Sequence, residues 1–129
     1  MQLFGRNRSG PGRVTVQEAA ARTGHTQSAE SGAPAVLLDV RESSEWRAGH
    51  APRAVHLPLT ALATGAELPA GTQERPVVVI CRSGHRSLRA AELLHAQGVE
   101  AVDVVGGMQN WAAAGLPVVD SLGGDGTIA

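Results

Sequence analysis

Residues 76–87 read PVVVICRSGHRS, and this stretch decides the fold of the chain. Four apolar β-branched residues, 77–80, follow a proline and precede a short turn that contains Gly84. Such a run predicts a strand that is buried on both faces of a parallel sheet. The chain's only cysteine, Cys81, comes directly after this strand. Ligands bind outside the carboxyl ends of the strands in open α/β sheets, so the thiol is expected where this fold places its chemistry.

Length and composition limit the other possibilities. The chain has 129 residues, of which 43% are hydrophobic and 18% charged, and this balance predicts one globular domain. The formal net charge is −1, so no overall positive field favours nucleic acid or an anionic membrane surface. No apolar run in the sequence approaches the roughly 18 residues of a membrane span. A single cysteine excludes an internal disulfide and a multi-cysteine metal site, and we expect a reducing, cytoplasmic compartment.

Strand and helix patterns alternate along the chain. We expect a flexible N-terminal arm over residues 1–13, one domain over 14–119 and a flexible C-terminal tail over 120–129. Further strands are predicted by the apolar runs at 35–40, 54–57 and 99–105. Because short helical patterns separate these runs, the sequence predicts an α/β domain with a mostly parallel sheet.

The turn after Cys81 has the composition of a loop that binds anions. Gly84 permits a tight turn, and Arg82 and Arg86 place two cations within five residues of the thiol. A helical pattern begins near Ser87, so the positive end of a helix is expected close to the sulfur, where it favours the thiolate. A lone buried cysteine is more often an inert core residue, but an inert thiol does not require neighbouring cations. The loop therefore indicates a reactive cysteine.

A carboxylate is expected at the same edge of the sheet. Asp39 lies near the end of the apolar run 35–40, and Arg41 follows two residues later. A carboxylate at the end of a buried strand is costly unless it is paired or hydrogen-bonded. We therefore expect Asp39 to face the edge that carries Cys81. Its pair with Arg41 has two interpretations that stay open, a purely structural contact or a support for the cysteine loop.

Three stretches of sequence occur in an order that is typical of one family. They are LDVRESSEWRAGH at 38–50 with AVHLP at 54–58, CRSGHRS at 81–87, and GGMQNWAAAGLP at 106–117. In motifs, order and spacing the chain resembles the rhodanese-like domains, the single-domain sulfurtransferases, over roughly residues 14–118. The resemblance implies an α/β fold with a mostly parallel five-stranded sheet and helices on both faces.

The resemblance also implies a role for each residue of the loop. Cys81 would take a sulfane sulfur from an anionic donor such as thiosulfate, hold it as a persulfide and pass it to cyanide or a cellular thiol. The substrate anion would be bound by Arg82, Ser83, Gly84, His85 and Arg86. The loop would be supported by Asp39, Arg41 and Ser87, with Ser87 as the cap of the following helix. No cofactor, nucleic acid or membrane is implied as a partner, and a monomer is expected.

The other histidines have less specific interpretations. His50 and His56 could carry protons, but local hydrogen bonding is the commoner role of such residues. His25 and His95 show no ligand spacing with a carboxylate or with the cysteine, so no metal site is predicted.

Two other functions stay open. Cysteine phosphatases also place a cysteine loop before a helix, but their arginine comes one position later than Arg86 because the loop must enclose a phosphate. Four residues separate Cys81 from Arg86, and Ser87 stands where that arginine would be. The same count applies to arsenate reduction on this plan. The second alternative is a binding or regulatory module without turnover, although adaptors of this family commonly lack the cysteine.

Overall fold

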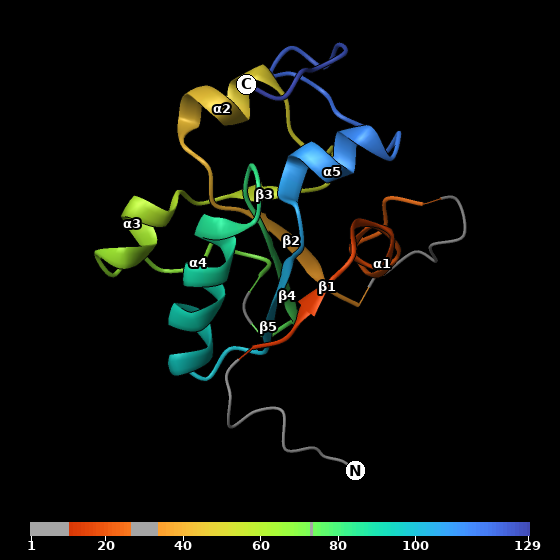
Figure 1. The fold of residues 1–129 in the computed structure, drawn as a ribbon. Helices are drawn as coiled ribbons and strands as arrows, with labels where there is room; N and C mark the ends of the chain where they lie inside the picture. Colours follow the sequence, from red (N-terminus) through yellow and green to blue (C-terminus); the bar gives the residue numbers. More distant parts are fainter. Residues whose placement is uncertain (1–10, 27–33, 73) are drawn as a thin grey trace.

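Five parallel strands form a single sheet in the computed structural model, which describes residues 11–26, 34–72 and 74–129. The strand order is β1-β5-β4-β2-β3 (Figure 1). The strands are β1 (Arg13–Val14), β2 (Val36–Asp39), β3 (Val55–His56), β4 (Val77–Ile80) and β5 (Ala101–Val104). Every pair of neighbouring strands is parallel, so the predicted α/β fold with a parallel five-stranded sheet is confirmed.

Helices cover both faces of the sheet. On one face α1 (Val16–Arg22) contacts α5 (Gly107–Ala113), and on the other α3 (Leu59–Ala63) contacts α4 (His85–Ala96) (Figure 1). α2 (Ser43–Ala48) follows β2 and lies beyond the carboxyl end of the sheet, at the top of Figure 1. None of the helices in the described ranges is long and apolar enough to cross a membrane.

The central strand β4 is buried along its whole length, as its apolar run predicts. Successive side chains of a strand point to opposite faces. Val78 and Ile80 therefore belong to the core cluster that contains Trp111 of α5. Val77 and Val79 belong to the cluster that contains residues of α3 and α4. Because both faces are packed, β4 holds the cysteine loop at a rigid point of the sheet.

The helix after the cysteine begins earlier than expected. The pattern predicts a start near Ser87, whereas α4 begins at His85 and Gly84 is its N-cap. Gly84 has a φ of 104°, in the left-handed region that glycine adopts without strain, and this turn allows the helix to start directly. Ser87 therefore lies in the first turn of α4 and is not the cap that the resemblance implied.

The edge strand β1 includes the last residue of the expected N-terminal arm, Arg13. Residues 1–10 of that arm lie outside the described residues, but Arg13 belongs to β1 and pairs with Asp103 of β5. The backbone N–H of Asp103 also donates to the carbonyl oxygen of Gly12 at 3.2 Å. The first strand thus begins one residue before the expected boundary at residue 14, because β5 offers it an unpaired edge.

The segment 120–129, for which we expected a flexible tail, contacts α2 and the core. The backbone N–H of Thr127 donates to the carbonyl oxygen of Ala48 at 2.9 Å, and Ile128 packs against the core. A Cβ atom on Gly126 would lie 2.8 Å from the Cα of Gly49, so two glycines allow this close approach. The structure differs from the expectation because residues distant in sequence provide these contacts.

Candidate active site

Cys81 follows the central strand and lies at the carboxyl edge of the sheet. Only 1% of the residue is exposed to solvent. Its Sγ accepts a hydrogen bond from the backbone N–H of Gly84 at 3.1 Å. A backbone donor in this position stabilises negative charge on the sulfur. The loop therefore holds the sulfur in a defined place and in an environment that suits a nucleophile.

Gly84 allows the loop to close around the sulfur. A Cβ atom at this position would lie 3.1 Å from the backbone nitrogen of Gly106 and 3.2 Å from Nη2 of Arg13. Both the left-handed backbone and the lack of space therefore require glycine. The 12 residues of α4 begin directly afterwards, so the positive end of the helix dipole lies at the loop.

Ser87 connects the cysteine to an ion pair whose carboxylate is completely buried and whose arginine is 39% exposed. The Sγ of Cys81 lies 3.5 Å from Oγ of Ser87, which donates a hydrogen bond to Oδ2 of Asp103 at 2.8 Å. Arg13 binds the same carboxylate through Nε at 2.8 Å and Nη2 at 3.1 Å. Nη2 of Arg13 also donates to the carbonyl oxygen of Gly84 at 2.9 Å. We call Arg13, Asp103 and Ser87 the inner network, since it holds the loop from the side of the sheet.

Two members of the inner network do not appear among the predicted site residues. Asp103 is completely buried and interrupts an apolar strand, which is the same signal that pointed to Asp39. Arg13 has no comparable signal, because it is 90 residues from its partner in a glycine-containing N-terminal stretch. Its hydrogen bond to Asp103 raises the pKa of Arg13 above the ordinary value, so the guanidinium stays charged.

Three of the predicted binding residues lie on the solvent side of the loop. Arg82 and His85 are exposed, and Ser83 is half-buried. Nε of Arg82 donates to the carbonyl oxygen of Ala129 at 2.8 Å. The Oγ of Ser83 lies 3.2 Å from Nδ1 of His85. The C-terminal segment thus reaches the same loop that carries the cysteine.

Arg86 points from the first turn of α4 to α2. Its Nη1 and Nη2 donate to Oε1 and Oε2 of Glu45 at 2.7 and 2.8 Å. These hydrogen bonds lower the pKa of Glu45 to about 2 and raise the pKa of Arg86. The Cys81 sulfur further raises the pKa of Arg86, which places the guanidinium within electrostatic reach of the thiolate. We call the Glu45–Arg86 pair and the hydrogen bond from Arg82 to Ala129 the outer contacts.

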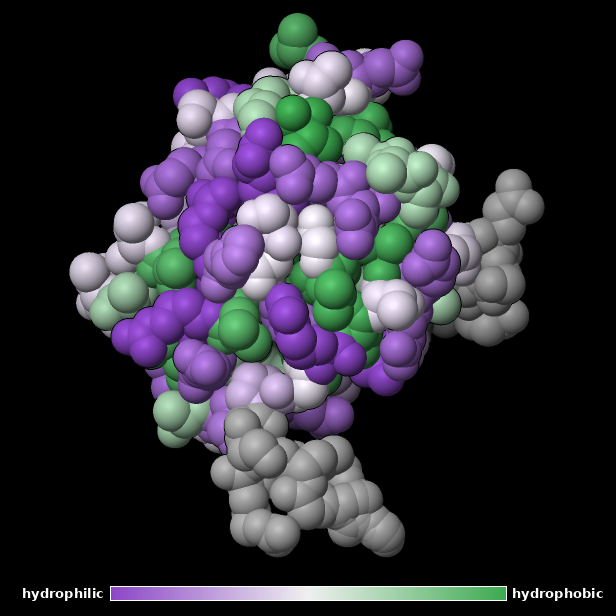
Figure 2. All heavy atoms as spheres, in the orientation of Figure 1, coloured by the Kyte–Doolittle hydropathy of each residue, from purple (hydrophilic) through white to green (hydrophobic). Residues whose placement is uncertain are grey.

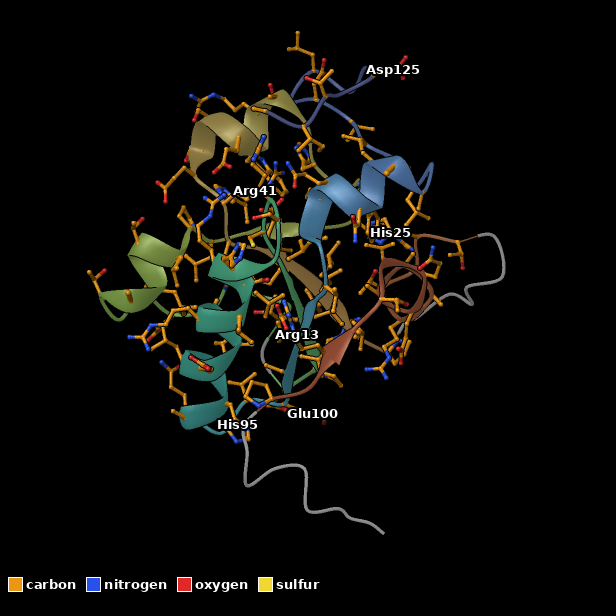
Figure 3. All side chains as sticks on the ribbon, in the orientation of Figure 1. Arg13, His25, Arg41, His95, Glu100 and Asp125 are labelled. Atoms are coloured by element: carbon orange, nitrogen blue, oxygen red, sulfur yellow. The ribbon has the colours of Figure 1, made fainter. Side chains whose placement is uncertain are left out.

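Asp39 and Arg41 form an ion pair in which both side chains are completely buried, and Arg41 lies below α2 in Figure 3. Nε and Nη2 of Arg41 donate to the Asp39 carboxylate at distances between 2.7 and 3.1 Å. Nη2 also donates to the carbonyl oxygen of Gly49 at 2.6 Å. Nη1 of Arg41 has no hydrogen-bond partner within the described part of the chain. The pair joins the end of β2 to the end of α2 and leaves one buried N–H without an acceptor.

Two histidines stack on the ring of Trp46, and a third packs edge-on against Trp111. The ring centroid of Trp46 lies 3.6 Å from that of His50 and 4.8 Å from that of His56. Both histidines also contact backbone carbonyl oxygens through a ring nitrogen. On the other side of the domain, His25 packs edge-on against Trp111 at 5.0 Å, and burial lowers its pKa to about 4. These contacts indicate packing roles.

A hollow lies toward the opposite end of the sheet, and Arg13 of the inner network is one of its lining residues. It measures about 680 Å³ and includes His95 and Glu100, which lie far from Arg41 in Figure 3. In the described ranges, no group of histidine, cysteine, aspartate or glutamate side chains is arranged to hold a metal ion.

The family model of the Rhodanese-like domain matches residues 16–114. A sulfurtransferase of Allochromatium vinosum is 38% identical over 86 residues, which cover 65% of this chain and 78% of the relative. The adenylyltransferase and sulfurtransferase UBA4 of Yarrowia lipolytica is 35% identical over 77 residues, which cover 60% of this chain. Those residues span only 19% of that longer relative.

The fold comparison agrees with the sequence comparison. The crystal structure of a rhodanese-related protein from Thermoplasma volcanium has a TM-score of 0.59 and 35% sequence identity. The match covers 67% of this chain and 84% of that structure.

Proposed function

The chain belongs to the family of the Rhodanese-like domain, and from this premise we propose that it carries a sulfane sulfur as a persulfide on Cys81. The observation that carries the proposal is the position of the sulfur. It lies at the end of the central strand, before α4, and accepts the Gly84 N–H at 3.1 Å. Similarity to proteins named as sulfurtransferases supports the same class of reaction.

The first half-reaction loads sulfur on the cysteine. The thiol first gives up its proton to solvent, and the thiolate then attacks the outer sulfur of a donor such as thiosulfate. A new S–S bond forms on Cys81 while the S–S bond of the donor breaks. Sulfite leaves with the electron pair of that bond. The Gly84 N–H and the positive end of α4 stabilise the charge on the cysteine sulfurs during this step.

The second half-reaction returns the thiolate. Cyanide or a cellular thiolate attacks the terminal sulfur of the persulfide, and the electron pair of the S–S bond returns to Cys81. The products are thiocyanate or a new persulfide, so atoms and charge balance without a cofactor.

The roles of the other residues follow from their positions. We propose that Arg82, Ser83, Gly84, His85 and Arg86 bind the donor anion. Ser87 positions the loop through its buried hydrogen bond to Asp103. Asp39 and Arg41 support it from the neighbouring strand, because Asp39 pairs in register with Ile80, the residue before Cys81. The unpartnered Nη1 of Arg41 supports an anion site nearby, since a buried N–H is costly without an acceptor.

A phosphatase would need an arginine that completes a phosphate loop. Arg86 is one position too close in sequence to Cys81 for that role. Ser87 stands at the position of that arginine and donates to Asp103. The length of the loop and the residue at this position favour sulfur transfer over phosphate or arsenate chemistry. Hydrolysis of an aryl phosphate faster than sulfur transfer from thiosulfate would reverse this order.

Mass spectrometry after incubation with thiosulfate tests the proposal. We expect the intact protein to gain one sulfur atom, to lose it again on addition of cyanide, and Cys81→Ser to gain none. A non-catalytic binding module would gain no sulfur from any sulfane donor while its thiol still reacted with an alkylating reagent. That result would contradict the proposed function.

We also propose that the protein works as a monomer in a reducing, cytoplasmic environment. Polar and apolar residues are interspersed over the face drawn in Figure 2, which offers little continuous apolar surface for a second copy. Light scattering after size-exclusion chromatography measures the oligomeric state directly, and a dimer would contradict this part.

A further inference from the structure

The Glu45 carboxylate is bound in the way that a ligand anion would be. Its two oxygens accept from the two terminal nitrogens of Arg86 at 2.7 and 2.8 Å. Glu45 comes from α2 and Arg86 from α4, so the pair bridges two elements beside the cysteine loop. A sulfonate group can form the same bidentate contact with a guanidinium through two of its oxygens.

The positive charges near the Glu45 carboxylate belong to Arg86 and Arg41, two residues of the candidate active site. Arg86 is the main cause of the low pKa of Glu45, and Arg41 contributes to it as well. Cys81 interacts electrostatically with the same Arg86 guanidinium. With a pKa of about 2, Glu45 is ionised at every pH at which the protein would act. A permanent negative charge therefore lies on an arginine that is expected to bind the anionic donor.

The ion pair is not a support of the core. The side chains of Arg86 and Glu45 are 34% and 17% exposed, and none of the residues of α2 is buried. By contrast, Asp39 and Arg41 are completely buried and join β2 to α2. The pair can therefore open without exposing apolar surface, and water can replace the lost contacts.

We propose that Glu45 is a specificity-determining residue that occupies Arg86 until the anionic group of the sulfur donor displaces it. This inference rests on the proposed function, and it adds that donor binding is an exchange of one anion for another. A donor with two or more anionic oxygens replaces the carboxylate contact fully, whereas a neutral donor leaves the pair closed. Glu45 thus lowers the affinity for every anion and admits those that bind Arg86 through two oxygens.

Glu45→Gln tests the exchange. Glutamine keeps the oxygen that accepts from the backbone N–H of Glu42, so the start of α2 is retained. Without the charge, we expect the KM for thiosulfate to fall by about fivefold, while the KM for a neutral organic trisulfide stays the same. Glu18→Gln is the matched control, because Glu18 pairs with Arg22 on the exposed surface of α1. Equal changes for both donors, or a higher KM for thiosulfate, would overturn the inference.

Binding of sulfate provides a readout that needs no turnover. Calorimetry should show about fivefold tighter sulfate binding by Glu45→Gln than by the wild type, with Glu18→Gln unchanged. If no donor yields sulfur transfer but this difference is found, the proposed function fails and the role of Glu45 stands. An unchanged sulfate affinity would refute the role of Glu45 even in an active sulfurtransferase.

A second variant covers the case in which Glu45→Gln does not fold. Glu45→Asp keeps the charge, but its shorter side chain loses one of the two contacts with Arg86. The sulfate affinity should then lie between those expected for the wild type and for glutamine. A value equal to or weaker than the wild-type affinity would contradict the exchange.

Discussion

The inner network and the outer contacts hold the same loop in different ways. On the inner side, Asp103 and Ser87 are completely buried, and the Asp103 carboxylate accepts hydrogen bonds from Ser87 and from Arg13, whose side chain is 39% exposed. On the outer side, Arg82 is exposed, and the pair that Arg86 forms with Glu45 is partly open to solvent. Loss of a buried polar partner on the inner side should therefore cost more stability than loss of a contact on the outer side.

The difference follows from solvation. Asp103 is completely buried, so the loss of its partner Arg13 would leave a carboxylate that water cannot reach, at a cost of about 3–5 kcal/mol. Removing one partner of an exposed pair changes stability by about 0–1 kcal/mol. The inner side is thus suited to fix the position of Cys81, and the outer side is suited to exchange its contacts for those of a ligand.

Cys81→Ser should have the largest effect on sulfur transfer, because the inner network and the outer contacts both hold the loop that carries this sulfur. We expect sulfur transfer to fall to the background rate with a change in unfolding free energy below about 1 kcal/mol, since the substitution is nearly isosteric. Steady-state transfer with thiosulfate and cyanide, together with urea unfolding, measures both quantities. Activity retained in the variant would show that the nucleophile is another group.

Asp103→Ala should break the inner side. The Ser87 hydroxyl would remain buried without its acceptor, and we expect a loss of about 1–3 kcal/mol in unfolding free energy. The Arg13 guanidinium adds little to this loss, because its side chain is 39% exposed and water can solvate it. Glu18→Ala, which breaks the exposed pair with Arg22, should cost less than about 0.5 kcal/mol. Urea unfolding of both variants makes the comparison, and similar losses would show that Asp103 contributes no more to stability than an exposed surface pair.

Gly49→Ala should disturb the C-terminal segment that completes the outer side. Gly49 has extended backbone, but a Cβ atom would lie 2.3 Å from the carbonyl oxygen of Thr127. We expect a loss of about 1–3 kcal/mol, because segment 120–129 must move. Gly124→Ala is the control, since its nearest contact would be 3.6 Å, at the Asp120 side chain. Thermal unfolding that does not separate the two variants would contradict this packing.

Arg82→Ala should give the smallest effect on stability and a selective effect on binding. The unfolding free energy should change by less than about 0.5 kcal/mol, because the side chain is exposed. The KM for thiosulfate should rise by about threefold and exceed any rise for a neutral trisulfide, since a cation near an anionic donor is lost. Parallel increases for both donors would assign Arg82 to loop structure instead.

Local patterns predicted the centre of this molecule well. The apolar run before Cys81 is sufficient to define a strand buried on both faces, and Gly84 marks the turn. Asp39 and Arg41 were predictable as a pair because they are two residues apart and a buried carboxylate needs a partner.

Contacts between distant segments were not predictable in this way. The partners Arg13 and Asp103 are 90 residues apart, and Arg86 is 41 residues from Glu45. The pairing of β1 with β5 brings the first two side chains together, and the second two meet because α2 lies near the start of α4. The direction of Arg86 and the course of segment 120–129 depend on such tertiary contacts, which leave no periodic signal in the sequence.

The stacking of Trp46 on His50 makes the intrinsic tryptophan fluorescence of the protein a measure of the surroundings of α2. Indole emission is sensitive to an adjacent imidazole and to its protonation, and the chain has only two tryptophans. The partner of Trp111 is His25, which stays neutral above about pH 4 because burial lowers its pKa. A change in emission on adding sulfate at neutral pH would therefore report on Trp46, which directly follows Glu45 on α2. The fluorescence of the unlabelled protein can thus follow the opening of the Glu45–Arg86 pair in real time.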